Sequence, residues 1–273
     1  MTRPDAATPI PGRAAWRTAY PRSRLAAALF LAVLATAVLR APPPHPAIEA
    51  TAPAGAGLTA AKPQPQRSTR YADFGSEVPG PAARHVADWV ADSNDHAGTD
   101  FIVVDKPAAK VYVFDAQARL RAATPVLLGS ARGDDSVPGI GTRPIADVEP
   151  HERTTPAGRF VAERGRNASG EDVVWVDYDA AVSMHRVRST VEAERRLQRL
   201  ATPTIADNRI SYGCINVPVA FYEAHVRPIF RTHRAIVYLL PETKSAQQVF
   251  GSYDVATAHA QRVSTAMASF RLP

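Results

Sequence analysis

Cysteine is nearly absent from this chain of 273 residues, in which Cys214 is the only example. One thiol cannot form an internal disulfide, so a scaffold stabilised by disulfides is excluded. The eight histidines are scattered. None of them stands in an i, i+4 pair or in the clustered Cys and His spacing of a zinc site. We therefore expect a protein that uses neither a metal nor a cofactor.

A basic surface is also lacking once the N-terminal segment is set aside. The formal net charge is +6, but residues 1–40 contain six arginines and one aspartate and so account for +5 of it. The rest of the chain is almost neutral. Proteins that bind nucleic acid need clustered Lys and Arg side chains, so the composition argues against a nucleic-acid partner.

Residues 1–40 have the pattern of an export signal. Basic residues between positions 13 and 24 precede fifteen uncharged residues, 25–39. That run is short for a membrane-spanning helix, which needs about twenty residues. A small-x-small cleavage site follows at residues 35–37. We expect a signal peptide or an N-terminal membrane anchor, with membrane contact only through this segment if it is not cleaved. In both cases the rest of the chain is exported.

The rest of the chain divides by composition into three parts. Residues 41–80 are rich in Pro and Ala, which predicts a disordered linker. Residues 95–241 alternate short apolar runs with turns, which predicts one mostly β domain, and residues 242–273 form a C-terminal extension. The expected strands are 101–104, 110–114, 124–128, 158–161, 173–176, 181–185 and 235–240. The first three of these are expected to be antiparallel, with one face in solvent. Helical spacing occurs at 82–91, 190–200 and 218–230, and residues 129–156 form a long loop.

The single cysteine lies in a short motif, residues 211–216, which reads SYGCIN. An unpaired thiol in an exported protein risks oxidation, which favours a use for it. His185 ends an upstream strand and is the candidate base that converts the thiol into a nucleophilic thiolate. Gly213 permits a sharp turn, at which the backbone N–H groups of Gly213 and Cys214 could face an oxyanion. The alternative is that Cys214 is a small buried hydrophobic residue.

These features resemble the L,D-transpeptidase catalytic domain (YkuD-like) family. In that family a histidine precedes the motif Ser/Thr-His-Gly-Cys-hydrophobic-Asn/Arg, which is similar to His185 followed by residues 211–216 here. The PV--G and TP-G-F stretches of the family look like residues 125–129 and 155–160, in the same order. Strands at 102–104, 111–114 and 236–240 also fit, so the resemblance covers about residues 100–241.

The resemblance implies a β-rich, sandwich-like or barrel-like catalytic fold with a few short helices. It implies a cysteine acyltransferase in which Cys214 attacks the substrate and His185 acts first as base and then as acid. The oxyanion and orienting positions of the family are matched by Ser211, Tyr212, Gly213 and Asn216. For Ser211 and Asn216, local capping of a turn is the alternative role.

The resemblance further implies peptidoglycan stem tetrapeptides as substrates, in the bacterial cell envelope (periplasm). The acyl group would pass to an amine acceptor, either a second stem in a 3→3 cross-link or a lipoprotein lysine. Such an enzyme would cross-link or remodel the cell wall and affect cell shape. Two alternatives stay open. With water as acceptor the protein would be an L,D-carboxypeptidase or endopeptidase, and without catalysis it would be a peptidoglycan-binding module of the same fold.

Two features depart from the family pattern. Tyr212 stands where the family has a histidine, and a phenol cannot accept a proton as an imidazole does, so substrate positioning or oxyanion support would differ. The interval between His185 and Ser211 is longer than usual and contains a charged amphipathic stretch around residues 191–200. This stretch either lies over the cleft or forms a solvated surface helix.

Overall fold

The computed structural model describes residues 68–231 and 233–270. The expected signal or anchor segment, residues 1–40, and most of the expected linker lie outside the described residues. Within the described part of the chain, no helix is both long enough and apolar enough to cross a membrane.

The fold is mostly β, as the sequence predicts. Among the described residues, one sheet has the strand order β3-β2-β1-β10-β5-β6-β7-β9, and a second, two-stranded sheet pairs β4 with β8. The strands are β1 (Phe101–Asp105), β2 (Lys110–Phe114), β3 (Leu120–Pro125), β4 (Leu128–Gly129), β5 (Gly158–Arg166), β6 (Asp172–Asp177), β7 (Val182–Arg186), β8 (Arg209–Ser211), β9 (Ile215–Val217) and β10 (Ala235–Leu239). Leu127, just after β3, exchanges two backbone hydrogen bonds with Asn216 of β9, at 2.9 and 2.8 Å. This pairing brings the two edges of the large sheet together into a nearly closed barrel.

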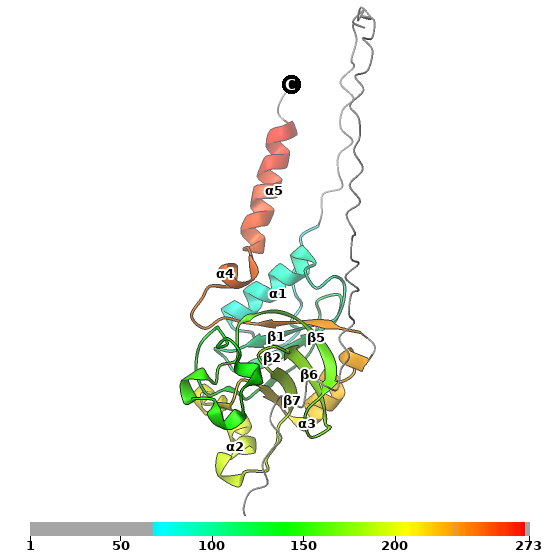
Figure 1. The fold of residues 1–273 in the computed structure, drawn as a ribbon. Helices are drawn as coiled ribbons and strands as arrows, with labels where there is room; N and C mark the ends of the chain where they lie inside the picture. The colour runs from blue at the N-terminus through cyan, green and yellow to red at the C-terminus, as the bar shows by residue number, and fades with distance from the viewer. Residues whose placement is uncertain (1–67, 232, 271–273) are drawn as a thin grey trace, which may run out of the picture. The chain divides into compact units, whose positions relative to one another are not determined.

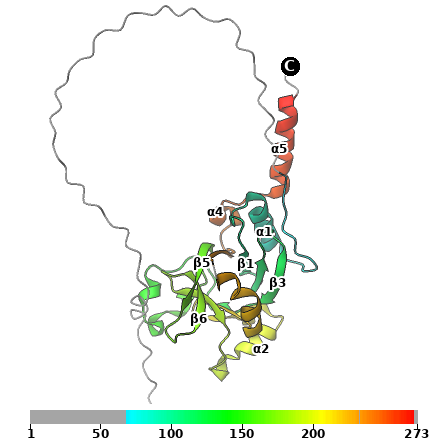
Figure 2. The ribbon, with the colours of Figure 1, turned by 90° about the vertical axis from the view of Figure 1, so that its right-hand side faces the viewer.

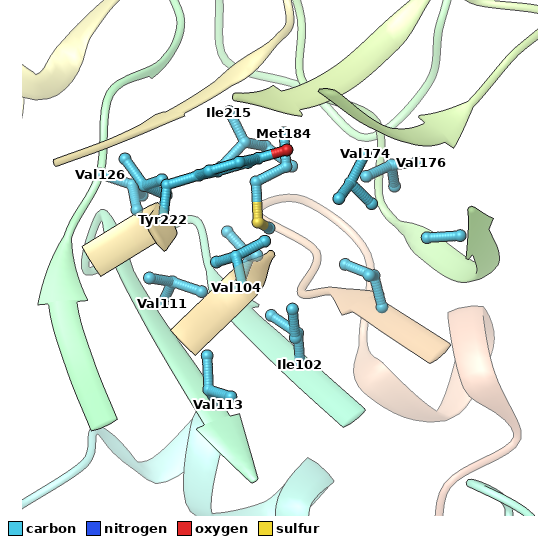
Figure 3. Close-up of a cluster of buried hydrophobic side chains, with 14 of the residues drawn as sticks. Ile102, Val104, Val111, Val113, Val126, Val174, Val176, Met184, Ile215 and Tyr222 are labelled. Atoms are coloured by element: carbon cyan, nitrogen blue, oxygen red, sulfur yellow. The ribbon is translucent and has the colours of Figure 1, made fainter. Parts of the chain in front are cut away.

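The central strands are buried on both faces. In β1, Ile102 and Val104 point into a core inside the curved sheet, whereas Phe101 and Val103 point into a second core on its outer face. Figure 3 shows the inner core, to which β7 contributes Met184. The expectation of one solvent-exposed face is therefore wrong for β1 and β2, because helices cover the outer side. The last expected strand is β10, which lies in mid-sheet between β1 (parallel) and β5 (antiparallel).

Three helices lie on the outer side of the sheet. They are α1 (Pro81–Ser93), α4 (Ala246–Phe250) and α5 (Val255–Phe270). Of these, α1 and α4 pack against the sheet, and α5 contributes Val255 to the outer core. Figures 1 and 2 show them on one side of the sheet, with α2 on the other. Ala72 and Phe74, within the expected linker 41–80, are buried in the same outer core. Ala72 and Phe74 thus pack against the domain.

The remaining helical segments are shorter than the sequence suggests. The stretch 190–200 contains a 3₁₀ turn, η5 (Glu192–Glu194), and then α2 (Arg196–Ala201). Arg195 separates the two because it adopts a left-handed backbone conformation, φ +51°. The stretch 218–230 begins as α3 (Val219–Phe221), continues as a π-helical segment, η7 (Tyr222–Val226), and is followed by the 3₁₀ turn η8 (Ile229–Arg231). The 3₁₀ turn η6 (Ile205–Asn208) precedes β8.

The expected long loop, residues 129–156, consists of short 3₁₀ turns held by a buried ionic cluster. The turns are η2 (Ile140–Thr142), η3 (Ile145–Asp147) and η4 (Pro150–Glu152). The fully buried ammonium group of Lys106 donates to Asp134 at 3.0 Å and to the carbonyl of Thr155 at 2.8 Å. Glu242, which pairs with Arg209, lies 4.0 Å from the same ammonium group. The cluster therefore fastens both ends of this loop to the sheet.

Candidate active site

The pairing of β7 with β9 places the predicted nucleophile and base next to each other. The strands are parallel, and in their register Met184 pairs with Ile215 and His185 pairs with Asn216. Since successive side chains alternate between the faces of a strand, Ser183 and His185 lie on the face opposite Met184. Cys214, one residue before β9, lies on that same face. The geometry therefore gathers Ser183, His185 and Cys214 into one site.

The imidazole of His185 has a defined tautomer. Its Nδ1 lies 2.8 Å from the backbone carbonyl oxygen of Arg186, and because a carbonyl only accepts, Nδ1 must donate. The other ring nitrogen, Nε2, is thereby left free of a proton to interact with the thiol of Cys214. This is the orientation that a general base requires.

The thiol and the imidazole favour each other's charged forms. Burial alone would raise the pKa of the Cys214 thiol, but the hydrogen bond and charge of His185 outweigh it and lower the pKa to about 7. Burial would lower the pKa of His185, but its contacts with Cys214 raise the pKa above the ordinary value. A second contribution comes from Ser183, whose hydroxyl lies 3.6 Å from the sulfur. Both shifts therefore favour the thiolate and imidazolium forms over the neutral pair.

The turn before the thiol requires a glycine. Gly213 has φ +123°, and a Cβ at this position would lie 2.7 Å from the carbonyl oxygen of Thr154. The hydroxyl of Ser211 holds the turn closed, since it donates to the carbonyl of Cys214 at 2.6 Å and accepts from the N–H of Gly213 at 3.1 Å. The N–H of Gly213 is therefore engaged within the turn, and the N–H of Cys214 becomes the candidate oxyanion donor.

Thr155 links three of the motifs found in the sequence. Its hydroxyl donates to the carbonyl of Gly213 at 2.8 Å and accepts from the N–H of Gly129 at 2.9 Å. Its own carbonyl accepts from Lys106. One buried hydroxyl therefore joins the stretches 125–129, 155–160 and 211–216. Lys106 of the buried ionic cluster binds the backbone of the same threonine.

Replacing Thr155 with valine, which has nearly the same shape, is expected to destabilise the domain. The change leaves the buried N–H of Gly129 and the carbonyl of Gly213 without this partner, at a cost of about 1–3 kcal/mol in the free energy of unfolding. Urea denaturation followed by tryptophan fluorescence measures this loss in the free energy of unfolding. Thr142→Val is the matched control, because its hydroxyl bonds only the carbonyl of Gly139 at an exposed turn. Equal losses in the two variants would contradict the role given to Thr155.

The two other orienting candidates have different surroundings. Asn216 is fully buried, and its Nδ2 donates to the carbonyl of Cys214 at 3.2 Å. Tyr212 is half-buried, and the guanidinium of Arg153 stacks over its ring at 4.0 Å from the ring centroid. That guanidinium also donates to the carbonyl of Val148. Tyr212 therefore packs against the 129–156 loop, whereas Asn216 supports the backbone of the nucleophile.

A cavity of about 370 Å³ adjoins the imidazole. His185 forms part of its wall, together with Val187, Val219 and the charged side chains of Glu171 and Arg188. The wall of this cavity is therefore partly apolar and partly charged, and it includes the candidate base.

Some residues of the site carry no clear mark in the sequence. Ser183 could have been found by its position two residues before His185, on the same face of one strand. The carbonyl of Arg186 leaves no mark, because every residue has a carbonyl. In the part of the chain that the structure describes, no cluster of three or more His, Cys, Asp or Glu side chains has the arrangement of a metal site.

The fold and site together define a β-rich domain with a neighbouring cysteine and histidine at a glycine turn. No family model and no curated protein sequence matches the chain. Among solved structures it is similar to a mutant L,D-transpeptidase from Enterococcus faecium, with 15% identity over 52% of this chain and a TM-score of 0.28. It is also similar to the helical cell shape determining protein Pgp2 from Campylobacter jejuni, with 14% identity over 57% of this chain and a TM-score of 0.36. The matches span only 50% and 55% of those chains, and similarities of this size do not assign the chain to a family.

Proposed function

We propose that this protein is an exported peptidoglycan L,D-transpeptidase that works through a cysteine acyl-enzyme. The observation that carries the proposal is the placement of Cys214 beside His185 by the pairing of β7 with β9, next to the Ser183 hydroxyl at 3.6 Å, where the imidazole lowers the pKa of the thiol to about 7. A thiolate beside an imidazolium is the form in which cysteine attacks carbonyl groups at neutral pH. The motifs at residues 125–129 and 155–160, which the hydroxyl of Thr155 ties to the cysteine turn, favour this chemistry over other thiol functions.

The first half of the reaction forms a thioester. The Cys214 thiolate attacks the carbonyl carbon between the third, L-configured centre and the terminal D-amino acid of a stem tetrapeptide. In this proposal the N–H of Cys214 stabilises the oxyanion that develops. The C–N bond then breaks, and the imidazolium of His185 gives its proton to the leaving amine. The free D-amino acid departs, and the acyl group stays on the sulfur.

The second half transfers the acyl group to an acceptor. Neutral His185 takes a proton from the incoming amine while that amine attacks the thioester carbonyl, and the C–S bond breaks to restore the thiolate and imidazolium. The acceptor in this proposal is an amine of a second stem or of a lipoprotein lysine, in the bacterial cell envelope. Water in the same position would release a tripeptide instead, which is the hydrolytic alternative.

Intact-mass spectrometry of the full chain incubated with a disaccharide tetrapeptide tests the proposal. The expected result is a thioester adduct on Cys214 with loss of the terminal D-amino acid, followed by a 3→3 linked dimer when a second stem is present. A tripeptide without dimer would replace the transferase by an L,D-carboxypeptidase. If no adduct forms on a chain whose thiol still reacts with iodoacetamide, the protein is not an enzyme of this class.

A further inference from the structure

One side chain from the longer interval between His185 and Ser211 reaches the turn at residues 211–214, which is called the catalytic turn below. Arg196 begins α2, and only 14% of its side chain is exposed. Its Nη1 donates to Oδ1 of Asn216 at 2.6 Å, and Nδ2 of the same amide donates to the carbonyl of Cys214 at 3.2 Å. The neighbouring Leu197 is 54% exposed, so α2 as a whole is a surface helix, from which Arg196 reaches the site.

The contact with Arg196 determines which way the amide of Asn216 points. An arginine has only donors, so it can bond the amide oxygen but not the amide nitrogen. With Oδ1 held by Arg196, Nδ2 must face the carbonyl of Cys214, where it adds a second hydrogen bond to that of Ser211. Without Arg196 the amide could turn over, and its oxygen would then face the carbonyl oxygen of the nucleophile. The orientation of the peptide unit at Cys214 therefore depends on a residue outside the motif.

Arg196 is itself held in place by the inserted interval. Its Nε donates to the carboxylate of Glu194 at 2.5 Å, and Glu194 belongs to the preceding 3₁₀ turn η5. Arg199 braces the same segment, because it donates to the backbone carbonyls of Glu194 at 2.8 Å and Asp207 at 2.9 Å. A pre-positioned arginine loses little conformational entropy when it acts, which suits a positioning role.

The charge of Arg196 also acts on the base. Cys214 and Arg196 are the charged groups that influence the His185 ring: Cys214 favours the imidazolium, and Arg196 opposes it. A cation near the ring helps the imidazolium give up its proton, and proton transfer to the leaving amine needs that step.

We propose that Arg196 is a positioning residue of the catalytic turn, which acts through Asn216 on the backbone of Cys214 and makes the inserted interval part of the active site. The effect on turnover rests on the proposed acyl transfer. The effect on the geometry and titration of the cysteine–histidine pair does not, because it needs no substrate.

Three variants of the full chain test this proposal. Arg196→Met keeps the apolar stem but removes the donors and the charge, and Arg196→Lys keeps a donor and a charge. Arg195→Met makes the same change at the neighbouring residue, whose side chain is exposed. Arg196→Met is expected to lower kcat for transfer by about 10- to 100-fold with little change in KM, as for a small misplacement of a reacting group. Arg196→Lys recovers part of the loss. Arg195→Met stays near the wild type.

A measurement without substrate separates positioning from a merely structural role. In a ¹H–¹⁵N NMR titration, the His185 ring of Arg196→Met is expected to lose its proton at a higher pH than in the wild type, and Arg195→Met is expected to leave that pH unchanged. An equal loss of kcat in Arg195→Met, a rise in KM alone, or an unmoved titration of His185 would each overturn the proposal. If the wild type forms no acyl-enzyme, the proposed function fails, while the NMR result still decides the role of Arg196.

Discussion

Replacing Cys214 with Ala is expected to abolish acyl-enzyme formation while leaving the fold intact. The thiol is the only sulfur nucleophile of the chain, and no other cysteine can replace it. Its contacts beyond His185 are long, 3.6 Å to the hydroxyl of Ser183 and 3.7 Å to the carbonyl of Ala181, so little stability depends on them. The measurement is the intact mass after incubation with a carbapenem, whose strained ring acylates thiolates, together with a thermal melt. An adduct on the alanine variant would contradict the assignment of the nucleophile.

The partner substitution, His185→Asn, separates the base from the nucleophile. Without the imidazole, the pKa of the thiol should rise from about 7 toward the ordinary value of about 8.5. At pH 7 the thiolate fraction then falls from about one half to about 3%, and the loss of proton transfer lowers the acylation rate by about 10²- to 10⁴-fold. The pH dependence of iodoacetamide alkylation measures the first effect, and acylation kinetics measure the second.

A matched control is available for the base. His151 lies exposed on η4, so His151→Asn removes an imidazole without touching the cysteine. Its alkylation profile should coincide with that of the wild type. An unchanged midpoint in His185→Asn would show that the low pKa of the thiol does not arise from His185, and the proposed mechanism would then lose its base.

The second large effect is on stability, and it concerns Asp134. Asp134 pairs with the buried ammonium of Lys106 and accepts three backbone hydrogen bonds, from residues 242, 243 and 244, at 2.7–2.8 Å. Asp134→Ala leaves that ammonium without its closest carboxylate inside the protein. Removing one partner of a buried pair costs about 3–5 kcal/mol, a large part of the stability of a single domain. Urea denaturation measures the loss, and Asp134→Asn, which keeps a hydrogen-bond acceptor, should lose less.

The neighbouring residue provides the control for Asp134. Asp135 pairs with Lys244 at 2.6 Å, but 75% of its side chain is exposed. Exposed ion pairs contribute about 0–1 kcal/mol, so Asp135→Ala should change the free energy of unfolding only slightly. Similar losses in the two variants would show that the buried cluster does not stabilise the fold as argued.

The pH dependence of stability provides an independent check on Asp134. Burial opposes its ionisation, but the hydrogen bonds from residues 242–244 outweigh this and hold the pKa of the carboxyl well below its ordinary value. A depressed pKa in the folded state contributes stability above about pH 4, and the contribution is lost as the pH falls from there through the folded-state pKa. The free energy of unfolding should therefore fall less steeply at low pH in Asp134→Ala than in the wild type. The same pH dependence in both proteins would contradict this role of Asp134.

Local patterns were sufficient to predict much of the fold. The expected strands at 101–104, 110–114 and 173–176 lie within β1, β2 and β6, because alternating or continuous β-branched side chains leave few other local structures. The expected helix at 82–91 lies within α1, because its apolar residues recur with helical spacing. The stretch 190–200 was less predictable. Its spacing suggests one helix, but the left-handed conformation of Arg195 breaks it.

The sequence alone identifies the functional groups of the site, which are a single thiol after a glycine, an upstream histidine, and short motifs in a fixed order. Only the tertiary structure decided which of these groups meet. Ser183 and His185 lie beside Cys214 because β7 and β9 pair in parallel, and that register depends on the packing of the whole inner core. The same packing brings Arg196 to Asn216. Contacts between segments distant along the chain follow from sheet order, which no local pattern encodes.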